Sequence, residues 1–80
     1  MDENTTPHDK LRAWLTDNGV SVPDFADAVG VSRIAVYAWM KTAIPSPLRR
    51  LAIETATGGA ITPSEWAKAA VVAVAMAANG

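Results

Sequence analysis

The sequence predicts an all-α domain of five short helices, and three observations support this. Apolar residues recur at spacings of three and four rather than two, which is typical of helices with one buried face. Residues that start helices alternate with glycine and proline stops, and no strand pattern separates them. The chain has 80 residues, half of them hydrophobic, which suits one domain near the lower size limit for an independent core.

The first two helices are predicted over residues 7–18 and about 22–29. Gly19 should end the first helix, because the pair Asn-Gly is a helix-stop signal. Ser21 should cap the start of the second helix, and Gly30 should end it by taking the left-handed conformation. The inward faces of these two helices are expected to consist of Leu11, Trp14, Leu15, Phe25, Ala26 and Val29.

The third and fourth helices are predicted over residues 33–41 and 47–57. Ser32 should cap the third helix, and the two prolines of TAIPSP, residues 42–47, should end it. Gly58 and the glycine after it should stop the fourth helix. The inward faces are expected to consist of Val36 and Trp39 on the third helix, and of Leu48, Leu51, Ala52 and Thr55 on the fourth.

The fifth helix is predicted over about residues 63–78. It begins with Thr-Pro-Ser-Glu, residues 62–65, which is a capping box with proline at the first helical position. Alanine and valine then cover the helix almost all the way round. Residues 7–80 are therefore expected to form the folded domain, and residues 1–6 a flexible acidic tail.

Charge is distributed unevenly along the chain, although the net charge is only −1. Residues 1–30 contain six acidic and two basic residues, a net charge of −4. Residues 31–53 contain four basic residues and no acidic one, a net charge of +4. A cationic patch contributed by one contiguous segment is the electrostatic pattern of a nucleic-acid-binding surface.

Several function classes find no support in the sequence. There is no cysteine, no glycine-rich phosphate loop and no catalytic constellation; the single histidine, His8, is expected to be a solvated surface residue. We therefore expect no enzyme activity, no metal, no cofactor and no small-molecule substrate. The polar start is unlike a signal peptide, and the longest apolar run has ten residues, against about 20 needed to span a membrane. A cytoplasmic protein without a membrane partner is expected.

The second and third predicted helices are joined by AVGVS, residues 28–32, a tight glycine turn. This is the layout of a helix-turn-helix, although an ordinary helical hairpin would have the same pattern. The segment FADAVGVSRIAVYAWM, residues 25–40, resembles the lambda-repressor/Cro-type helix-turn-helix. The continuation IPSPLRRLAIETATGGAIT, residues 44–62, resembles more narrowly the YdaS-like, Cro-type prophage regulators.

This resemblance implies a lambda-repressor-like fold and a Cro-like phage or prophage repressor that binds double-stranded operator DNA. The helix over residues 33–41 would lie in the major groove, and Arg33 in its first turn can direct a fork of donors toward guanine O6 and N7. The positions that the resemblance assigns to DNA contact are Ser32, Arg33, Ile34, Tyr37, Ala38, Lys41 and Arg49.

The fifth helix is predicted to form a homodimer interface, because a helix that is apolar all round is buried on more than one side. Repressors of this kind need two-fold symmetry to contact two half-sites. The residues predicted at the interface are Trp66, Val71, Val72 and Met76. The alternative for this helix is that it wraps around its own bundle.

A second function also fits the sequence, in which the helix-turn-helix fold serves as a protein-binding module such as an anti-repressor or an adaptor. Val22 stands where the family usually has a glutamine that bonds a phosphate. Asp24 and Asp27 lie on the same helix and would be repelled by phosphate if they faced it. These three residues favour a partner other than DNA.

Overall fold

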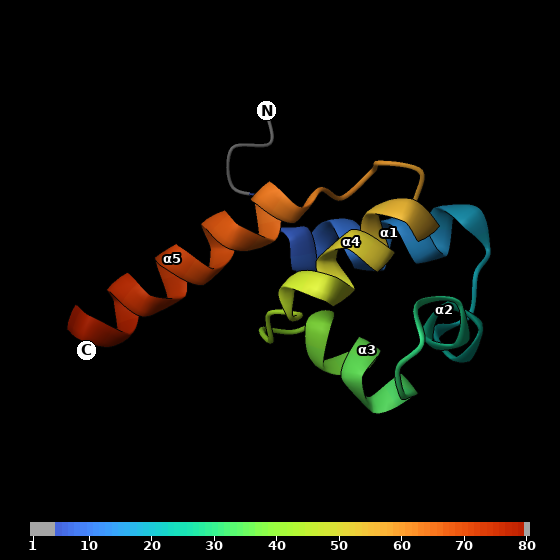
Figure 1. The fold of residues 1–80 in the computed structure, drawn as a ribbon, viewed down its shortest axis with the longest axis horizontal. Coiled ribbons are helices and arrows are strands. Elements are labelled where there is room, and N and C mark those ends of the chain that lie inside the picture. Colours follow the sequence, from blue (N-terminus) through green and yellow to red (C-terminus); the bar gives the residue numbers. More distant parts are fainter. Residues whose placement is uncertain (1–4, 80) are drawn as a thin grey trace.

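Five α-helices follow one another in the predicted order and are joined by short loops (Figure 1). The computed structural model describes the backbone of residues 5–79 and the side chains of residues 5–75, and no strand occurs among them. The predicted tail, residues 1–6, lies outside the described residues except for Thr5 and Thr6. The helices are α1 (Pro7–Asn18), α2 (Val22–Val29), α3 (Arg33–Trp39), α4 (Pro47–Ala56) and α5 (Pro63–Asn79).

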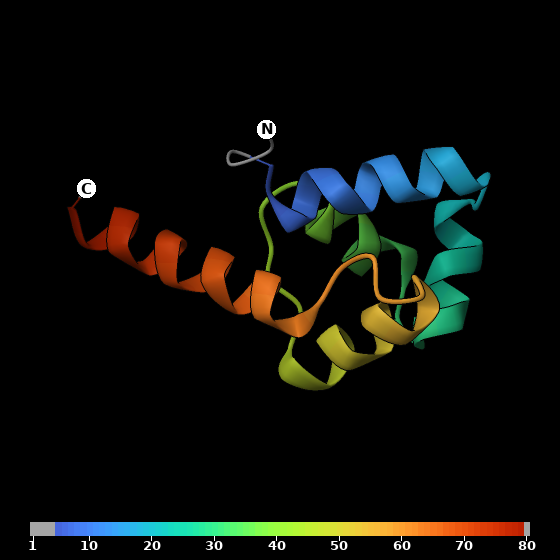
Figure 2. The ribbon, with the colours of Figure 1, turned by 90° about the horizontal axis from the view of Figure 1, so that it is seen from above.

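The first four helices enclose a single core, and α5 leads away from it. In Figure 2, α1 and α4 lie on opposite sides of the molecule, α2 closes one end, and α5 leaves at the other end. The core contains side chains from all five helices and from the loop before α5. Its buried members are Leu11, Leu15, Phe25, Ala26, Val29, Val36, Trp39, Ile53, Ile61 and Trp66.

Polar side chains begin the first three helices, as capping requires. The Ser21 hydroxyl accepts a hydrogen bond from the amide of Asp24 at 3.2 Å. The Ser32 hydroxyl accepts one from the amide of Ala35 at 3.3 Å. Thr6 caps α1 in the same way. Each cap satisfies an amide that has no partner within its own helix, which confirms the caps predicted for α2 and α3.

Two helices end slightly earlier than predicted, each for a local reason. The last residue of α3 is Trp39, two residues before the predicted end, because the amides of residues 41–43 all donate to the carbonyl of Ala38 and form a tight turn. The last residue of α4 comes one residue early. Thr57 follows it, and its buried hydroxyl donates to the carbonyl of Ile53 at 2.8 Å.

The face that α4 turns toward the core differs from the prediction. Three of the four residues expected to face inward are exposed, namely Leu48, Leu51 and Thr55. Ile53 is fully buried instead. Arg49 and Arg50 are half-buried in this orientation, and both donate to backbone carbonyls of the same chain. The two leucines lie in solvent.

The start of α5 is fixed to the rest of the molecule by Glu65 and Trp66. The Glu65 carboxylate accepts from the amide of Thr62 at 2.9 Å, which forms one half of the predicted capping box, and it forms an ion pair with Lys10 of α1. Trp66 is fully buried. The five residues 71–75 are all exposed, so the second half of α5 leaves the core.

The ion pair between α1 and α5 should make the stability of the fold depend on pH. Burial raises the pKa of Glu65, but the hydrogen bond from Lys10, the amide of Thr62 and the Lys10 charge outweigh burial and lower the pKa. A carboxyl with a lowered folded pKa stabilises the fold above its unfolded pKa, and this contribution is lost as the pH falls through the folded pKa. Between about pH 6 and pH 3, the free energy of unfolding in urea should therefore fall less for Glu65→Gln than for the wild type.

Glu54→Gln is the matched control, since the Glu54 carboxylate has no hydrogen bond or ion pair among residues 5–75. Its acid-induced loss should equal that of the wild type. Equal loss in Glu65→Gln and the wild type would show that the pair with Lys10 does not contribute to stability.

Candidate nucleic-acid interface

A turn of three residues joins α2 to α3, and the two helices pack against each other. Gly30 adopts the left-handed conformation with φ of 76°, which residues with a side chain rarely adopt. The amide of Val31 then donates to the carbonyl of Ala26 at 2.9 Å and closes the end of α2. Ser32 follows at once as the cap of α3. The turn therefore determines the direction in which α3 begins.

The outward face of α3 carries several of the side chains that the family resemblance would place in contact with DNA. Arg33 is exposed, and 76% of Ile34 and 49% of Tyr37 are accessible to solvent. Val36 and Trp39 are buried on the opposite face, as predicted. Because residues three and four apart share one face of a helix, Arg33 and Tyr37 lie side by side along the outer surface.

The two ends of α3 add further polar groups to this face. Ser32 is exposed at the start, and its hydroxyl hydrogen stays available while the oxygen caps the helix. Lys41 is exposed just after the end of the helix. Ala38 is half-buried, so only part of its methyl surface is open to a ligand.

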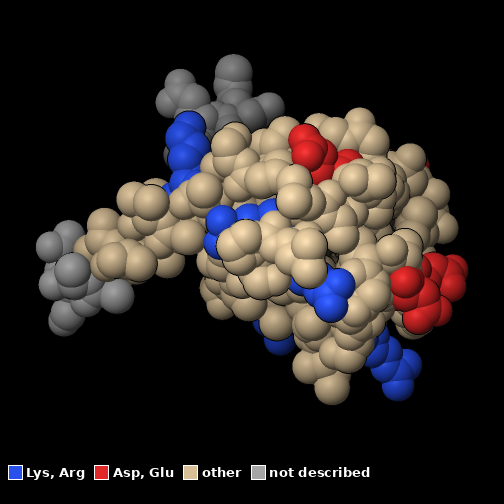
Figure 3. All heavy atoms as spheres, in the orientation of Figure 1, with Lys and Arg blue, Asp and Glu red and all other residues tan. Residues whose placement is uncertain are grey.

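Cations without a partner gather around α3. Four of the seven basic side chains contact acceptors of the chain itself: Lys10, Arg12, Arg49 and Arg50. Within residues 5–75, Arg33, Lys41 and Lys68 have neither an ion pair nor a hydrogen bond. In Figure 3, blue spheres lie along the lower edge of the molecule, in the region of α3, and also over α4. Two of the three unpartnered cations therefore belong to α3 or its end.

Arg49 is more constrained than a predicted phosphate contact would suggest. It is half-buried, and its Nη1 donates to the carbonyl of Val29, the last residue of α2, at 3.2 Å. Arg50 likewise donates through Nε to the carbonyl of Pro45 at 2.8 Å. The +4 charge counted in the sequence is thus divided between two unengaged cations and two that are held by the fold.

The acidic residues of α2 lie on the side away from its buried face. Asp24 and Asp27 are exposed, whereas Phe25, Ala26 and Val29 are buried. Figure 3 shows red spheres at the edge where α2 lies in Figure 1. Neither carboxylate has an ion-pair partner among residues 5–75. A band of negative charge therefore flanks the cationic outer face of α3.

His8 is a packing residue rather than the solvated surface residue that the sequence predicts. It is half-buried, and its Nδ1–H donates to the carbonyl of Trp39 at 2.7 Å. Its ring also meets the ring of Trp66 edge-on, with centroids 5.3 Å apart. His8 therefore joins α1 to the end of α3 and to the start of α5.

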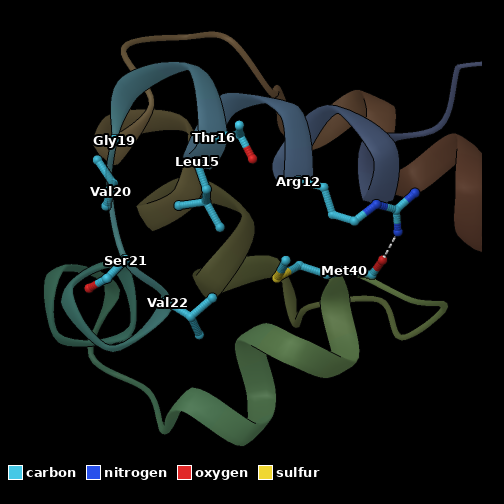
Figure 4. Close-up of a pocket in the computed structure, with 8 residues that line it drawn as sticks. All are labelled: Arg12, Leu15, Thr16, Gly19, Val20, Ser21, Val22 and Met40. Carbon is cyan, nitrogen blue, oxygen red and sulfur yellow. Dashed lines mark hydrogen bonds between the residues drawn. The ribbon is translucent and has the colours of Figure 1, made fainter.

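An open depression of about 480 Å³ lies between the end of α1, the start of α2 and Met40 (Figure 4). Leu15, Val22 and Met40 contribute apolar surface to it. Arg12 borders one side and bonds to the carbonyl of Met40. The apolar part of this lining suits van der Waals contact with an apolar group.

The predicted dimer-interface residues separate into two groups. Trp66 is fully buried within its own chain, which leaves it no exposed surface for the predicted dimer contact. It fills the space where α5 meets α1 and α4. Val71 and Val72 are 68% and 56% exposed and stay available to a partner. The Met76 side chain lies outside the described residues.

Comparisons with family models, curated proteins and solved structures find no match to the chain. Within the described residues, no helix is long and apolar enough to cross a membrane. No group of three or more histidine, aspartate and glutamate side chains in that part of the chain is placed to hold a metal ion.

Sequence reasoning missed two features of this region. One is the contact of Arg49 with the end of α2, and the other is the exposure of Leu48 and Leu51 on α4. The left-handed glycine at position 30 was the available signal for a special turn, but it does not reveal which side chain covers that turn.

Proposed function

We propose that the protein is a sequence-specific regulator that binds double-stranded DNA, with α2, the turn at Gly30 and α3 acting as a helix-turn-helix. The observation that carries the proposal is the outward face of α3, where Arg33, Ile34 and Tyr37 are exposed. Two cations without a partner among residues 5–75, Arg33 and Lys41, mark the start and the end of this face. An exposed helix with cations at its start and end is suited to the major groove. The resemblance to Cro-type prophage regulators adds a phage or prophage repressor as the specific class.

Base readout in this proposal belongs to the first turn of α3. Arg33 has no acceptor among residues 5–75, so its guanidinium is free to donate to guanine O6 and N7. Ile34 is the most exposed large apolar side chain of the helix, and it suits contact with a thymine methyl. Ala38 contributes less, because it is half-buried.

Phosphate contacts belong to the ends of α3. The Ser32 hydroxyl donates to a phosphate at the start, and Lys41 binds a phosphate at the end. Tyr37 lies between Ser32 and Lys41, where its phenol would reach the DNA backbone. These contacts position the helix without reading sequence.

Dimerisation through the second half of α5 completes the proposal. Residues 71–75 are all exposed and all apolar, which leaves a helix segment in water with no polar face. Residues 69–80 contain no charged side chain, so the side chains of two copies can meet on a two-fold axis without charge repulsion. A two-fold pair would present two copies of α3 to two half-sites.

Salt dependence of DNA binding tests the proposal. Lys41 is the charged phosphate contact of each protomer, which gives two in a dimer, and the log–log slope of affinity against salt should be about −2. Fluorescence anisotropy with DNA from upstream of the protein's own gene provides the measurement. A slope near zero, or an affinity for unrelated DNA equal to that for the upstream DNA, would contradict the proposal.

Two substitutions on α3 should separate specificity from general affinity. Arg33→Ala should weaken binding by about 1–3 kcal/mol and relax preference at one base-pair position. Lys41→Ala should weaken all sequences equally and reduce the magnitude of the salt slope by about 1 per protomer. Titrations against a panel of single-base operator variants measure both effects. Unchanged preference in Arg33→Ala would mean that the base-contacting residue is assigned incorrectly.

A second function is favoured by two specific observations. Leu48 and Leu51 are 68% and 55% exposed on the outer face of α4, and Asp24 and Asp27 are exposed on α2. Exposed leucines one turn apart with nearby acids suit a protein partner better than a phosphate backbone. In this case the protein would flow through heparin at low salt, and Leu51→Asp would abolish binding to a stoichiometric partner. The DNA-binding proposal predicts retention on heparin instead.

A further inference from the structure

Arg49, in the first turn of α4, reaches the end of α2. Its Nη1 donates to the carbonyl of Val29 at 3.2 Å. The carbonyls of Ala26 and Asp27 in the same turn have backbone partners, since the amides of Val31 and Gly30 donate to them. Arg49 therefore supplies a donor to a helix-end carbonyl that accepts from no other described residue, and its charge also complements the negative end of the helix.

The same guanidinium lies over the turn that follows. A side-chain carbon added at Gly30 would lie 3.3 Å from Arg49 Nη1, which is tighter than ordinary packing. Gly30 is also left-handed, with φ of 76°. Arg49 therefore lies directly against the position that a side chain at residue 30 would take, just before the turn leads into α3.

Arg49 is held in this place by the packing of its own helix. Ile53 lies one turn further along the same face of α4 and is fully buried, and α4 packs against α2. Residues four apart share a helix face, so the buried Ile53 keeps Arg49 directed toward α2. The side chain is half-buried as a result.

We propose that Arg49 is a positioning residue for DNA readout: it fixes the turn between α2 and α3 and so sets the angle at which α3 enters the groove. This inference rests on the proposed DNA-binding function. It differs from the phosphate contact that the family resemblance implies at this position. A phosphate contact acts equally on all sequences, whereas a fixed helix direction matters most for the operator, where the base contacts must align.

The salt slope and the ratio of operator to random-DNA affinity distinguish a positioning residue from a phosphate contact. The variant is Arg49→Ala, and the matched control is Lys41→Ala, which removes an exposed cation near the end of α3. Anisotropy titrations with operator and random duplexes at several salt concentrations give the slope and the ratio of the two affinities. Arg49→Ala should lower that ratio about tenfold, the scale of one hydrogen bond from a charged donor, and should leave the slope unchanged. Lys41→Ala should change the slope and leave the ratio intact.

Arg49→Lys is the second variant, and it keeps the positioning role testable if Arg49→Ala does not fold. It retains the charge but has a flexible ammonium in place of the planar guanidinium beside Gly30. A positioning role predicts a lowered ratio in Arg49→Lys as well. The inference is overturned if Arg49→Ala reduces the slope by about 1 per protomer with the ratio intact, if neither quantity changes, or if Arg49→Lys restores wild-type binding.

Hydrogen exchange tests the turn without DNA. The amide of Val31, bonded to Ala26, and the amide of Ala35, bonded to Ser32, report on the two sides of the turn. Both should exchange faster in Arg49→Ala and Arg49→Lys, and neither should change in Lys41→Ala. Unchanged exchange in the Arg49 variants overturns the inference, even if DNA binding is found. If the wild type binds no DNA, the proposed function fails separately, and faster exchange would still identify the contact that holds the turn.

Discussion

Replacing Trp66 with alanine should lower the free energy of unfolding by about 3–5 kcal/mol. Trp66 is fully buried where α5 meets the body of the protein, and its ring contacts the ring of His8. Removing the indole leaves a cavity that α1, α4 and α5 cannot close without moving. A domain of this size has a total stability of about 4–12 kcal/mol, so the loss is a large part of it. Urea unfolding followed by circular dichroism measures the change.

Trp66→Phe is the matched control. The indole Nε1 of Trp66 is buried and has no hydrogen-bond partner among the described residues. Leaving such a donor unpaired costs about 1–3 kcal/mol, and phenylalanine removes the donor while keeping most of the ring. Trp66→Phe should therefore lose much less stability than Trp66→Ala. If Trp66→Ala were fully stable but monomeric, Trp66 would be an interface residue, as the sequence predicts.

Introducing a carboxylate at position 72 should split the proposed dimer. Val72 is 56% exposed in the protomer, so Val72→Asp leaves the core unchanged. In a two-fold pair of α5 helices, the same carboxylates would be buried without partners, which costs several kcal/mol. Sedimentation should show a dimer for the wild type and a folded monomer for the variant, with a steep loss of operator affinity.

Ala60→Asp is the control for the added charge, because Ala60 is exposed in the loop between α4 and α5. It should remain dimeric and bind DNA as the wild type does. A wild type that sediments as a monomer at high micromolar concentration would contradict the α5 dimer. Unfolding of Val72→Asp would instead show that this part of α5 belongs to the core of its own protomer.

The helices were predictable because their signals are local. Serine and threonine caps, glycine stops and prolines act within a few residues, and the five helices lie where these signals place them. The inward face of α4 was not predictable in this way. Its sequence offers leucines on one side and Ile53 on the other, and the side that is buried goes with contacts outside the helix, such as those of Arg49 and Arg50 with backbone carbonyls.

The candidate site was predictable to a similar extent. The outward face of α3 follows from helical periodicity, since Val36 and Trp39 must face the core and Arg33, Ile34 and Tyr37 then face away. The contacts around it join residues far apart in sequence, 20 positions between Arg49 and Val29 and 31 between His8 and Trp39. No local pattern reveals such pairs, so the roles of Arg49 and His8 emerge only in three dimensions.

Selection from a pool of random double-stranded DNA tests the central claim most directly. DNA readout by α3 in a two-fold dimer predicts enrichment of an inverted repeat whose half-sites are about 10 base pairs apart, or a multiple of that spacing. The same selection with Arg33→Ala should lose preference at one position in each half-site. A pool that shows no enriched sequence after repeated rounds, with a folded wild-type protein, would contradict the account.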